Sequence, residues 1–271
     1  MKAVILTGGK SSRMGQDKAT LEIGGVTLLD RMASVVRPLT EETFLSVAHD
    51  DDRATTLPAL RDLEPSPGPL GGLQAAFRHD SEGPWLVLAC DLALITTAEI
   101  ERLVEAYDPA SEVTCFLSPL DKNPEPLCAI YAPSAAKKLE EAFASGRRSA
   151  RQFVDSLSRI ELEPFDPRVL LNLNRPEYLV ELRHLEKSEM TEKEITIEYF
   201  AKLSGEAGVE SEVFRTSSAT LAGVWEELRL RHRFSLDLPH VKPAINNEFV
   251  DWTALLEDGQ TIAFMPPFAG G

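Results

Sequence analysis

The chain has 271 residues, 43% of them hydrophobic, which is enough for two domains with separate cores. Its formal net charge of -15 argues against a general nucleic-acid-binding or anionic-membrane-binding surface. No apolar run approaches the ~20 residues of a membrane span, and the amino terminus passes directly into an apolar run. We therefore expect neither a transmembrane helix nor a signal peptide.

The cysteines and histidines favour a reducing compartment and give no metal signature. Cys90, Cys115 and Cys128 form no C-x-x-C pair, and their odd number suits a cytoplasmic protein. The five histidines are scattered without the spacing of metal ligands. We expect a cytoplasmic location and no zinc site.

A loop rich in glycine and cations follows the first predicted strand, Ala3–Leu6. Residues 6–18 read LTGGKSSRMGQDK. Glycines permit positive φ and close approach of another molecule, and successive N–H groups in such a loop form a nest for anions. The residues that give the loop this character are Gly8, Gly9, Gly15 and the cations Lys10, Arg13 and Lys18. The pattern indicates a site for a nucleoside triphosphate.

Two commoner phosphate loops do not fit this stretch. A Walker A motif needs a glycine five residues before Gly9, where this chain has Val4, and no G-x-G-x-x-G is present. The spacing instead resembles the signature L-A-G-G-x-x-x-R-M-G-x-D-K of the MobA-like nucleotidyltransferases, which include molybdenum cofactor guanylyltransferases; Thr7 replaces the family's alanine.

That resemblance implies an α/β, Rossmann-like domain with a mixed, mostly parallel sheet. It also implies that the loop binds GTP, with Lys18 and Arg13 as catalytic residues that neutralise the triphosphate. The nucleotide-binding residues that it assigns to this stretch are Leu6, Thr7, Gly8, Gly9, Lys10, Gly15 and Lys18.

The next elements lead to a second glycine-rich loop. A short strand and turn at Leu21–Gly25 precede a helix over Thr27–Val36 and a strand over Thr43–Ala48. Residues 68–73, GPLGGL, then open a helix that runs through Arg78. They resemble the family's G-P-L-A-G segment, which lines the base pocket; the alternative is a rigid connector. The resemblance assigns base binding to Pro69, Leu70 and Gly71, and Asp62 could accept from the ring N–H and amino donors of a base.

The run Pro84–Ala89 has the pattern of a central strand, and Asp91 follows its carboxyl end, where open α/β sheets bind ligands. A carboxylate there can hold Mg²⁺ against a triphosphate. The family reads C-D-x-P at this point, whereas this chain has Ala93 in place of the proline. We expect Asp91 to be the catalytic metal ligand.

The next predicted helix, Thr97–Tyr107, directs Ile100 and Leu103 inward and Glu99 and Arg102 largely outward. Further predicted elements are strands at Val113–Leu117 and Leu127–Tyr131 and helices at Ser134–Ala144 and Ser149–Leu157. For Arg147, Arg148 and Arg151 two interpretations stay open, contact with an anionic pterin or a solvated face.

Residues 169–177 resemble the family's closing N-x-N-T-P-x-D segment, although Arg175 and Tyr178 depart from it. A strand end that displays Asn172 and Asn174 on one side could orient phosphates on the acceptor side. The resemblance covers residues 1–185, which we predict to be one nucleotidyltransferase domain.

A second domain is predicted at residues 194–271, after a polar linker at 186–193. From Ile195 apolar residues alternate, as in a half-buried strand. A helix over Thr220–Arg231 and short strands at Pro243–Phe249 and Gln260–Phe264 follow. This set of elements suggests a small α+β domain of the β-grasp, ubiquitin-like class.

The last residues, AFMPPFAGG, resemble the end of the small, sulfur-carrying subunit of molybdopterin synthase. The prolines stiffen the tail, and Gly270 and Gly271 are slender enough to enter a narrow active site. The resemblance implies that an E1-like adenylating enzyme activates the Gly271 carboxylate. It implies that the resulting thiocarboxylate then serves the large subunit of molybdopterin synthase.

The two resemblances belong to one pathway, so we interpret the chain as a bifunctional protein of molybdenum cofactor biosynthesis. Its N-terminal domain would transfer GMP from GTP to molybdenum-molybdopterin with Mg²⁺ and release pyrophosphate. Two alternatives stay open: use of CTP or another acceptor, and a sulfur carrier with a weakened nucleotidyltransferase scaffold, which the absent proline favours. Implied partners include the molybdenum-insertion protein and molybdoenzyme chaperones, but no nucleic acid and no membrane.

Overall fold

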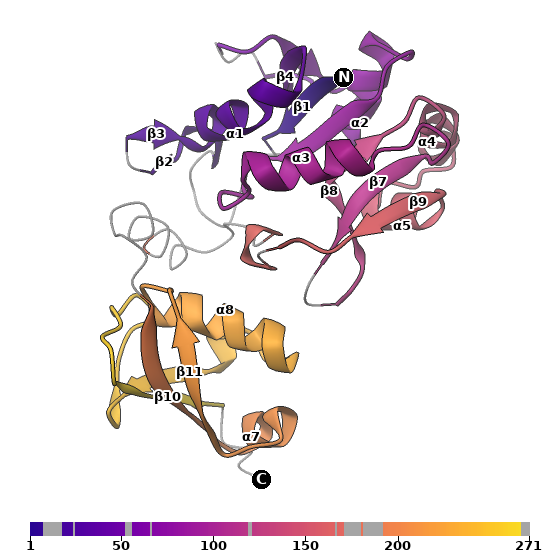
Figure 1. The fold of residues 1–271 in the computed structure, drawn as a ribbon. Helices are drawn as coiled ribbons and strands as arrows, with labels where there is room; N and C mark the ends of the chain where they lie inside the picture. The colour runs from indigo at the N-terminus through magenta and orange to yellow at the C-terminus, as the bar shows by residue number, and fades with distance from the viewer. Residues whose placement is uncertain are drawn as a thin grey trace. The chain divides into compact units, whose positions relative to one another are not determined.

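The computed structural model describes residues 1–7, 18–23, 25–51, 56–65, 67–118, 121–165, 167–170, 180 and 192–266. The chain divides into two compact units, Met1–Asn174 and Arg175–Gly271 (Figure 1). The predicted boundary at residue 185 lies outside the described residues, so the division into 1–185, 186–193 and 194–271 stays a prediction.

The N-terminal unit is built on a sheet whose described strands follow the order β5-β4-β1-β6-β8-β7-β9. Among them β8 runs antiparallel to its neighbours β6 and β7, and the other adjacent pairs are parallel. This confirms the mixed, mostly parallel sheet expected from the sequence. The strands are β1 (Lys2–Leu6), β4 (Glu42–Val47), β5 (Ala59–Arg61), β6 (Trp85–Ala89), β7 (Val113–Leu117), β8 (Pro124–Tyr131) and β9 (Arg159–Leu162).

Helices cover both faces of this sheet, because its central strands are apolar on both sides. In β1, Val4 belongs to a core shared with α2, α4 and α5, and the next residue, Ile5, belongs to a core shared with α1 and α3. The result is a three-layer α/β unit. The helices are α1 (Leu28–Val36), α2 (Leu70–His79), α3 (Thr97–Ala106), α4 (Ala135–Ala144) and α5 (Ala150–Asp155).

Several local features differ from the sequence predictions. The edge strands β5 and β9 were not predicted, and a separate hairpin of β2 (Glu22–Ile23) and β3 (Val26–Thr27) precedes α1. Val169 and Leu170 lie in a 3-10 helix, Pro167–Leu170, rather than in a strand.

Glu99 was predicted to point largely outward, yet only 3% of its surface is exposed. The chain after β9 folds back over α3, where the N–H of Phe165 donates to the Glu99 carboxylate at 2.6 Å. Arg102 forms an ion pair with Glu99 at 2.8 Å and lies 3.7 Å from the centre of the Phe165 ring. Tertiary contacts that helical periodicity does not reveal therefore bury this carboxylate.

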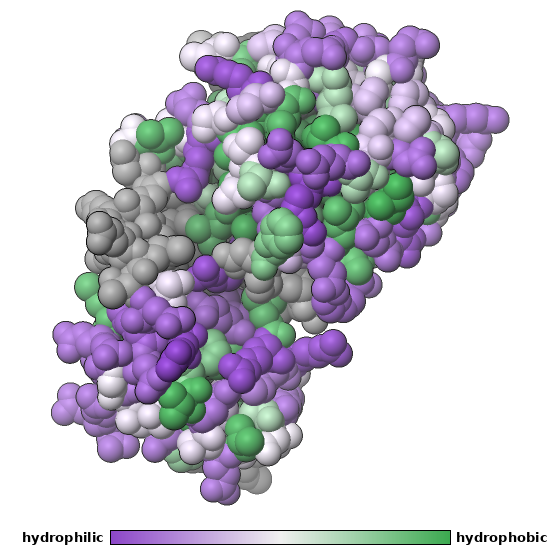
Figure 2. Space-filling model, viewed as in Figure 1, coloured by the Kyte–Doolittle hydropathy of each residue, from purple (hydrophilic) through white to green (hydrophobic). Residues whose placement is uncertain are grey.

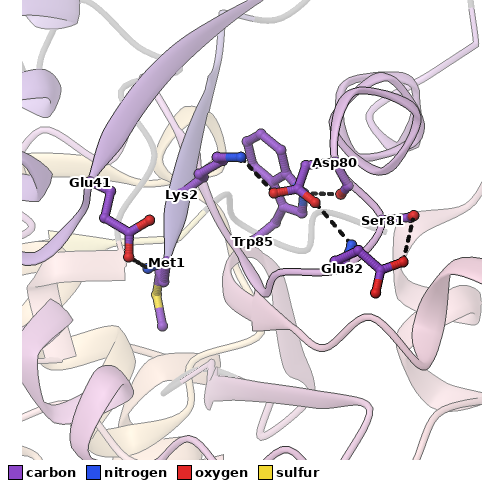
Figure 3. A network of polar contacts seen from close by, with 7 residues as sticks. All are labelled: Met1, Lys2, Glu41, Asp80, Ser81, Glu82 and Trp85. Atoms are coloured by element: carbon purple, nitrogen blue, oxygen red, sulfur yellow. Dashed lines mark hydrogen bonds and ion pairs between the residues drawn. The ribbon is translucent and has the colours of Figure 1, made fainter.

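A polar network closes the amino end of the sheet, at the start of β1 (Figure 3). Lys2 at this end of β1 forms a 2.5 Å ion pair with Asp80, which follows α2. The Asp80 carboxylate also accepts from the N–H of Glu82 at 2.9 Å, and its backbone carbonyl accepts from the Trp85 indole at 2.8 Å. The network ties α2 and β6 to β1.

The C-terminal unit has a sheet whose described strands follow the order β11-β10-β14-β12-β13. The central pair β10–β14 is parallel, and α8 packs on one face with Trp225 buried against Phe264. This arrangement confirms the β-grasp class, although α7 and β11 were not predicted. The elements are β10 (Lys193–Tyr199), α7 (Lys202–Ala207), β11 (Ser211–Thr216), α8 (Leu221–His232), a 3-10 helix (Leu238–His240), β12 (Lys242–Ile245), β13 (Glu248–Phe249) and β14 (Thr261–Met265).

The visible surface of each unit is mainly hydrophilic, with apolar residues in small groups (Figure 2). In the described part of the chain, no helix combines the length and the apolar character that crossing a membrane requires.

Candidate nucleotide site

The carboxyl ends of β1, β4 and β6 meet at one edge of the N-terminal sheet, which is where parallel sheets bind ligands. Leu6 ends β1, and its carbonyl accepts from the N–H of Cys90, just past β6, at 3.0 Å. The predicted loop residues Gly8, Gly9, Lys10, Arg13 and Gly15 follow Leu6 and Thr7 in the chain but lie outside the described residues. Lys18 opens a 3-10 helix, Lys18–Thr20, and its side chain is not described.

Thr7 anchors the strand end from which this loop departs. Its hydroxyl donates to the carbonyl of Ser46 in β4 at 2.9 Å, and the residue is only 6% exposed. The hydroxyl that distinguishes Thr7 from the family's alanine is thus satisfied inside the protein. It fixes the end of β1 to β4.

Two glycines let α2 approach this edge closely. A Cβ on Gly72 would lie 2.4 Å from a methyl carbon of Leu6 and 2.6 Å from the Ser46 hydroxyl oxygen. A Cβ on Gly71 would lie 2.2 Å from Cγ of Pro67 and 2.7 Å from a carboxylate oxygen of Asp62. A side chain at either position would collide with these neighbouring atoms, so only glycine lets α2 lie this close to the edge of the sheet.

Asp62 follows β5 and is held through its backbone. Its N–H donates to the carbonyl of Val47 at 3.0 Å, and its own carbonyl lies 3.0 Å from Nδ1 of His49. Its carboxylate oxygen Oδ1 is buried and has no hydrogen-bond partner among the described residues. Burial raises the pKa of Asp62 to about 6, against a smaller lowering by His49. An acceptor buried in this way favours a ligand that brings N–H donors.

The other predicted base-pocket residues begin α2. Pro69 is exposed and precedes the helix, and the Gly71 N–H donates to the Gly68 carbonyl at 3.0 Å. The Leu70 side chain is 2% exposed and packs into the core, so only its backbone is available to a ligand. The structure thus brings Asp62 and Gly71 into contact and turns the Leu70 side chain away.

Asp91 lies just past β6, half-buried, and Ala93 after it is almost fully buried. The register of β6 and β8 ends at Leu88 and Cys128, and Glu125, near the start of β8, feels the charge of Asp91. Burial raises the pKa of Glu125, and the charge of Asp91 adds to that effect, while the Leu127 N–H opposes it.

The sequence analysis missed Glu125, because the pairing of β8 with β6 cannot be read from their order in the chain. In the described residues no group of three or more histidine, cysteine or acidic side chains is placed to hold a metal ion. Mg²⁺ usually needs only one or two carboxylates when phosphates supply its other ligands. The oxygen donors of Asp91 and Glu125 fit that requirement.

The arginines after α4 are all engaged within the protein. Arg147 contacts a serine hydroxyl on its own turn, Arg148 pairs with Glu64, and Arg151 pairs with Asp121 at 3.0 Å. Burial alone would raise the pKa of Asp121, but hydrogen bonds and the Arg151 charge bring it down to about 2. Arg147 and Arg151 are nevertheless exposed, as a solvated face predicts, and contact with a pterin stays a prediction.

Besides the loop residues named above, four more predicted functional residues lie outside the described set: Asn172, Asn174, Gly270 and Gly271. In the C-terminal unit the description ends at Pro266, one residue after β14. The assignments of these four residues stay predictions.

Two family models match this chain. Residues 3–160 match the family described as "MobA-like NTP transferase domain", and residues 197–271 match the ThiS family. The two matched segments fall in the two compact units.

Individual relatives agree with these matches. A molybdenum cofactor guanylyltransferase of Pseudomonas paraeruginosa is 36% identical over 193 residues, which cover 67% of this chain and 94% of that protein. A molybdenum cofactor biosynthesis bifunctional protein of Synechocystis is 30% identical over 177 residues, covering 64% of this chain; the match spans only about half, 51%, of that relative's length.

Among solved structures, molybdopterin-guanine dinucleotide biosynthesis protein A of Archaeoglobus fulgidus aligns with a TM-score of 0.58 and 25% identity. The alignment covers 69% of this chain and 99% of that one.

Proposed function

This chain belongs to the MobA-like NTP transferase family, and we propose that its N-terminal unit transfers GMP from GTP to molybdenum-molybdopterin. The family makes the chain a nucleotidyltransferase of molybdenum cofactor biosynthesis that also carries a ThiS-like domain. We propose GTP as the nucleotide, molybdenum-molybdopterin as the acceptor and Mg²⁺ as the metal.

The observation that carries the choice of guanine is the buried carboxylate oxygen of Asp62 beside Gly71, which has no hydrogen-bond partner among the described residues. The Watson–Crick edge of guanine presents two neighbouring donors, the ring N–H and the amino group, which a carboxylate can accept together. Cytosine presents one amino group next to a ring acceptor, which would face the carboxylate unfavourably. Because the pKa of Asp62 is about 6, the carboxylate is mostly charged at neutral pH.

The triphosphate would lie over the carboxyl ends of β1 and β6. Lys10, Arg13 and Lys18, with the loop amides, would neutralise its charge. Asp91, with Glu125 close by, would hold Mg²⁺, which would supply positive charge to the phosphates. Residues 6 and 7 hold the start of this loop through the Thr7–Ser46 bond.

A phosphate oxygen of the acceptor would attack the α-phosphorus of GTP, and the bond to pyrophosphate would break. The buried cysteines support a reaction without a protein nucleophile. Burial raises the pKa of Cys115 to about 12 and that of Cys128 well above its ordinary value, so both remain inert thiols. Asn172 and Asn174 would orient the acceptor phosphate.

For the C-terminal unit we propose sulfur transfer through a thiocarboxylate at Gly271. The ThiS family match, which runs through residue 271, and the β-grasp fold support this role. Its partners would be an E1-like adenylating enzyme and the large subunit of molybdopterin synthase. Mass spectrometry after incubation with an adenylating enzyme, ATP and a sulfur donor should show one carboxylate oxygen replaced by sulfur, the oxygen leaving with AMP; a chain that stays unmodified would contradict the role.

The transfer reaction can be tested with the full chain, α-labelled GTP, Mg²⁺ and molybdenum-molybdopterin. We expect label in the dinucleotide product and one pyrophosphate released for each GMP transferred. Transfer from CTP but not GTP would overturn the choice of base. Absence of transfer from any nucleotide would favour the weakened-scaffold alternative.

A further inference from the structure

The guanidinium of Arg148 joins two segments that are far apart in the sequence. Its Nη2 lies 3.3 Å from both carboxylate oxygens of Glu64, and its Nη1 donates to the carbonyl of Phe143, near the end of α4, at 2.9 Å. The guanidinium carbon also lies 4.3 Å from the centre of the Phe143 ring. A planar, forked cation held from two sides fixes the direction of its partner carboxylate.

The backbone of Arg148 lies close to the same loop at a second point. A Cβ on Gly68, whose φ is +75°, would lie 3.4 Å from the Arg148 carbonyl oxygen. The carbonyl of Gly68 in turn accepts from the N–H of Gly71 in the first turn of α2. The turn after α4 therefore supports the chain just before the predicted base-binding helix.

Arg148 contacts the middle of the loop between β5 and α2, at Glu64, before the buried Pro67. The beginning of this loop is fixed by the hydrogen bond from Asp62 to Val47, and its end is fixed by Gly68 and Gly71. Between these points Leu63 is 45% exposed. Surface loops with few buried contacts open readily, and Glu64 is the residue through which Arg148 restrains this one.

We propose that Arg148 is a positioning residue for the nucleobase. It acts through Glu64 and Gly68, which hold the loop so that the Asp62 carboxylate keeps one orientation. This inference rests on the proposed role of Asp62 in binding the base. It predicts that loss of Arg148 affects recognition of the base and leaves recognition of the phosphates unchanged.

The test uses the full chain and two probes, GTP with Mg²⁺ and inorganic tripolyphosphate with Mg²⁺. The Arg148→Ala variant should bind GTP roughly three- to fivefold more weakly, the effect expected when one partly exposed ion pair that positions the site is lost. Its affinity for tripolyphosphate should not change. Hydrogen exchange at the Asp62 and Gly71 amides should become faster.

Two further substitutions sharpen the experiment. Glu64→Gln should reproduce the loss of GTP affinity, and the double variant with Arg148→Ala should lose less than the sum of both losses. The matched control is Arg78→Ala, which removes the 3.2 Å ion pair of Arg78 in α2 with Glu140 in α4. It should leave both affinities unchanged.

Two outcomes would overturn the inference. An equal loss of affinity for GTP and tripolyphosphate would show that Arg148 acts on the phosphates. An unchanged affinity for GTP would show that Arg148 does not position the base. If Arg148→Ala does not fold, Arg148→Lys and Glu64→Gln carry the same test. If the unsubstituted chain binds tripolyphosphate but no nucleoside triphosphate preferentially, the proposed base site fails, and this inference fails with it.

Discussion

The negative charge on the Asp62 carboxylate suits a base-binding role, but its burial lowers the stability of the folded state. The pKa of Asp62 is about 6 in the folded protein and 3.8 for an ordinary aspartate, so the folded state binds the proton more tightly. Stability due to this group therefore falls as pH rises from 3.8 to about 6 and stays lower above it.

We accordingly predict that Asp62→Asn stabilises the N-terminal unit near neutral pH while weakening GTP binding. After allowance for solvent screening of a half-buried group, the gain should be about 1 kcal/mol, or a rise in Tm of about 2–4 °C. Thermal unfolding should show the gain at about pH 7.5 and little of it at about pH 4. A variant that is less stable at neutral pH would contradict the assignment of a desolvated carboxylate.

The paired glycines of α2 allow a second residue-scale prediction. Gly72→Ala should destabilise the N-terminal unit by about 1–2 kcal/mol, because overpacking against Leu6 and Ser46 outweighs the gain in helix propensity. The control is Gly205→Ala in α7, where a Cβ would have no atom within 4 Å. That substitution should stabilise the C-terminal unit. Denaturant unfolding of both variants tests the pair, and equal effects would contradict it.

Sequence reasoning proposed Gly71 and Asp91 as site residues because they stand in motifs, and Asp62 because its carboxylate could accept from base donors; these roles stay predictions. It could not assign the Leu70 side chain to the core or find that Glu125 is close enough to Asp91 to feel its charge. Both facts depend on packing between elements that are distant in the chain.

At the scale of elements, the network at the amino end of the sheet contributes stability that depends on pH. The hydrogen bond from Lys2, followed by that from the Glu82 N–H, lowers the pKa of Asp80 from 3.8 to about 2. This stability is fully present above pH 3.8 and is lost as pH falls toward 2.

We predict that Asp80→Asn lowers the Tm of the N-terminal unit slightly at neutral pH, and that most of the difference is lost by about pH 2. The replacement retains the backbone carbonyl that accepts from the Trp85 indole, so the change in Tm reports only the loss of the carboxylate charge. Calorimetry as a function of pH provides the measurement. A difference that persists unchanged at low pH would show that the ion pair is not its origin.

The elements that could be predicted are those with a long, regular apolar pattern. The helices α1 and α3 begin at threonines whose side chains accept N–H bonds, and their buried faces follow the helical period. The strands β5 and β9 have three and four residues with charged positions, too short for alternation to be distinctive. Glu99 was assigned to the wrong environment because the chain after β9 covers it.

At the scale of the whole molecule, the two units have separate cores. In the C-terminal unit Trp225 is fully buried and contacts Phe234, Trp252 and Phe264. Trp225→Ala should cost about 3–5 kcal/mol, which is comparable to the whole stability of a domain of this size.

We therefore predict that Trp225→Ala unfolds the C-terminal unit and prevents thiocarboxylate formation while GTP affinity is retained. Hydrogen exchange resolved by unit, together with nucleotide binding, tests this. A parallel loss of nucleotide binding would show that the units do not fold independently.

The domain classes of both units could be inferred from short motifs at their ends, where residue type and spacing are restricted by chemistry. The order of the strands and the approach of α2 to β1 depend on tertiary packing, and only the structure supplies them.

The most direct test of the central claim is equilibrium binding of GTP, CTP and ATP with Mg²⁺ to the intact chain and to Asp91→Ala. We predict selective binding of GTP, weakened at least about tenfold in the variant, as expected when a metal-binding carboxylate is removed. Selective binding of CTP would contradict the role assigned to Asp62. Failure to bind any of the three nucleotides would contradict the guanylyltransferase itself.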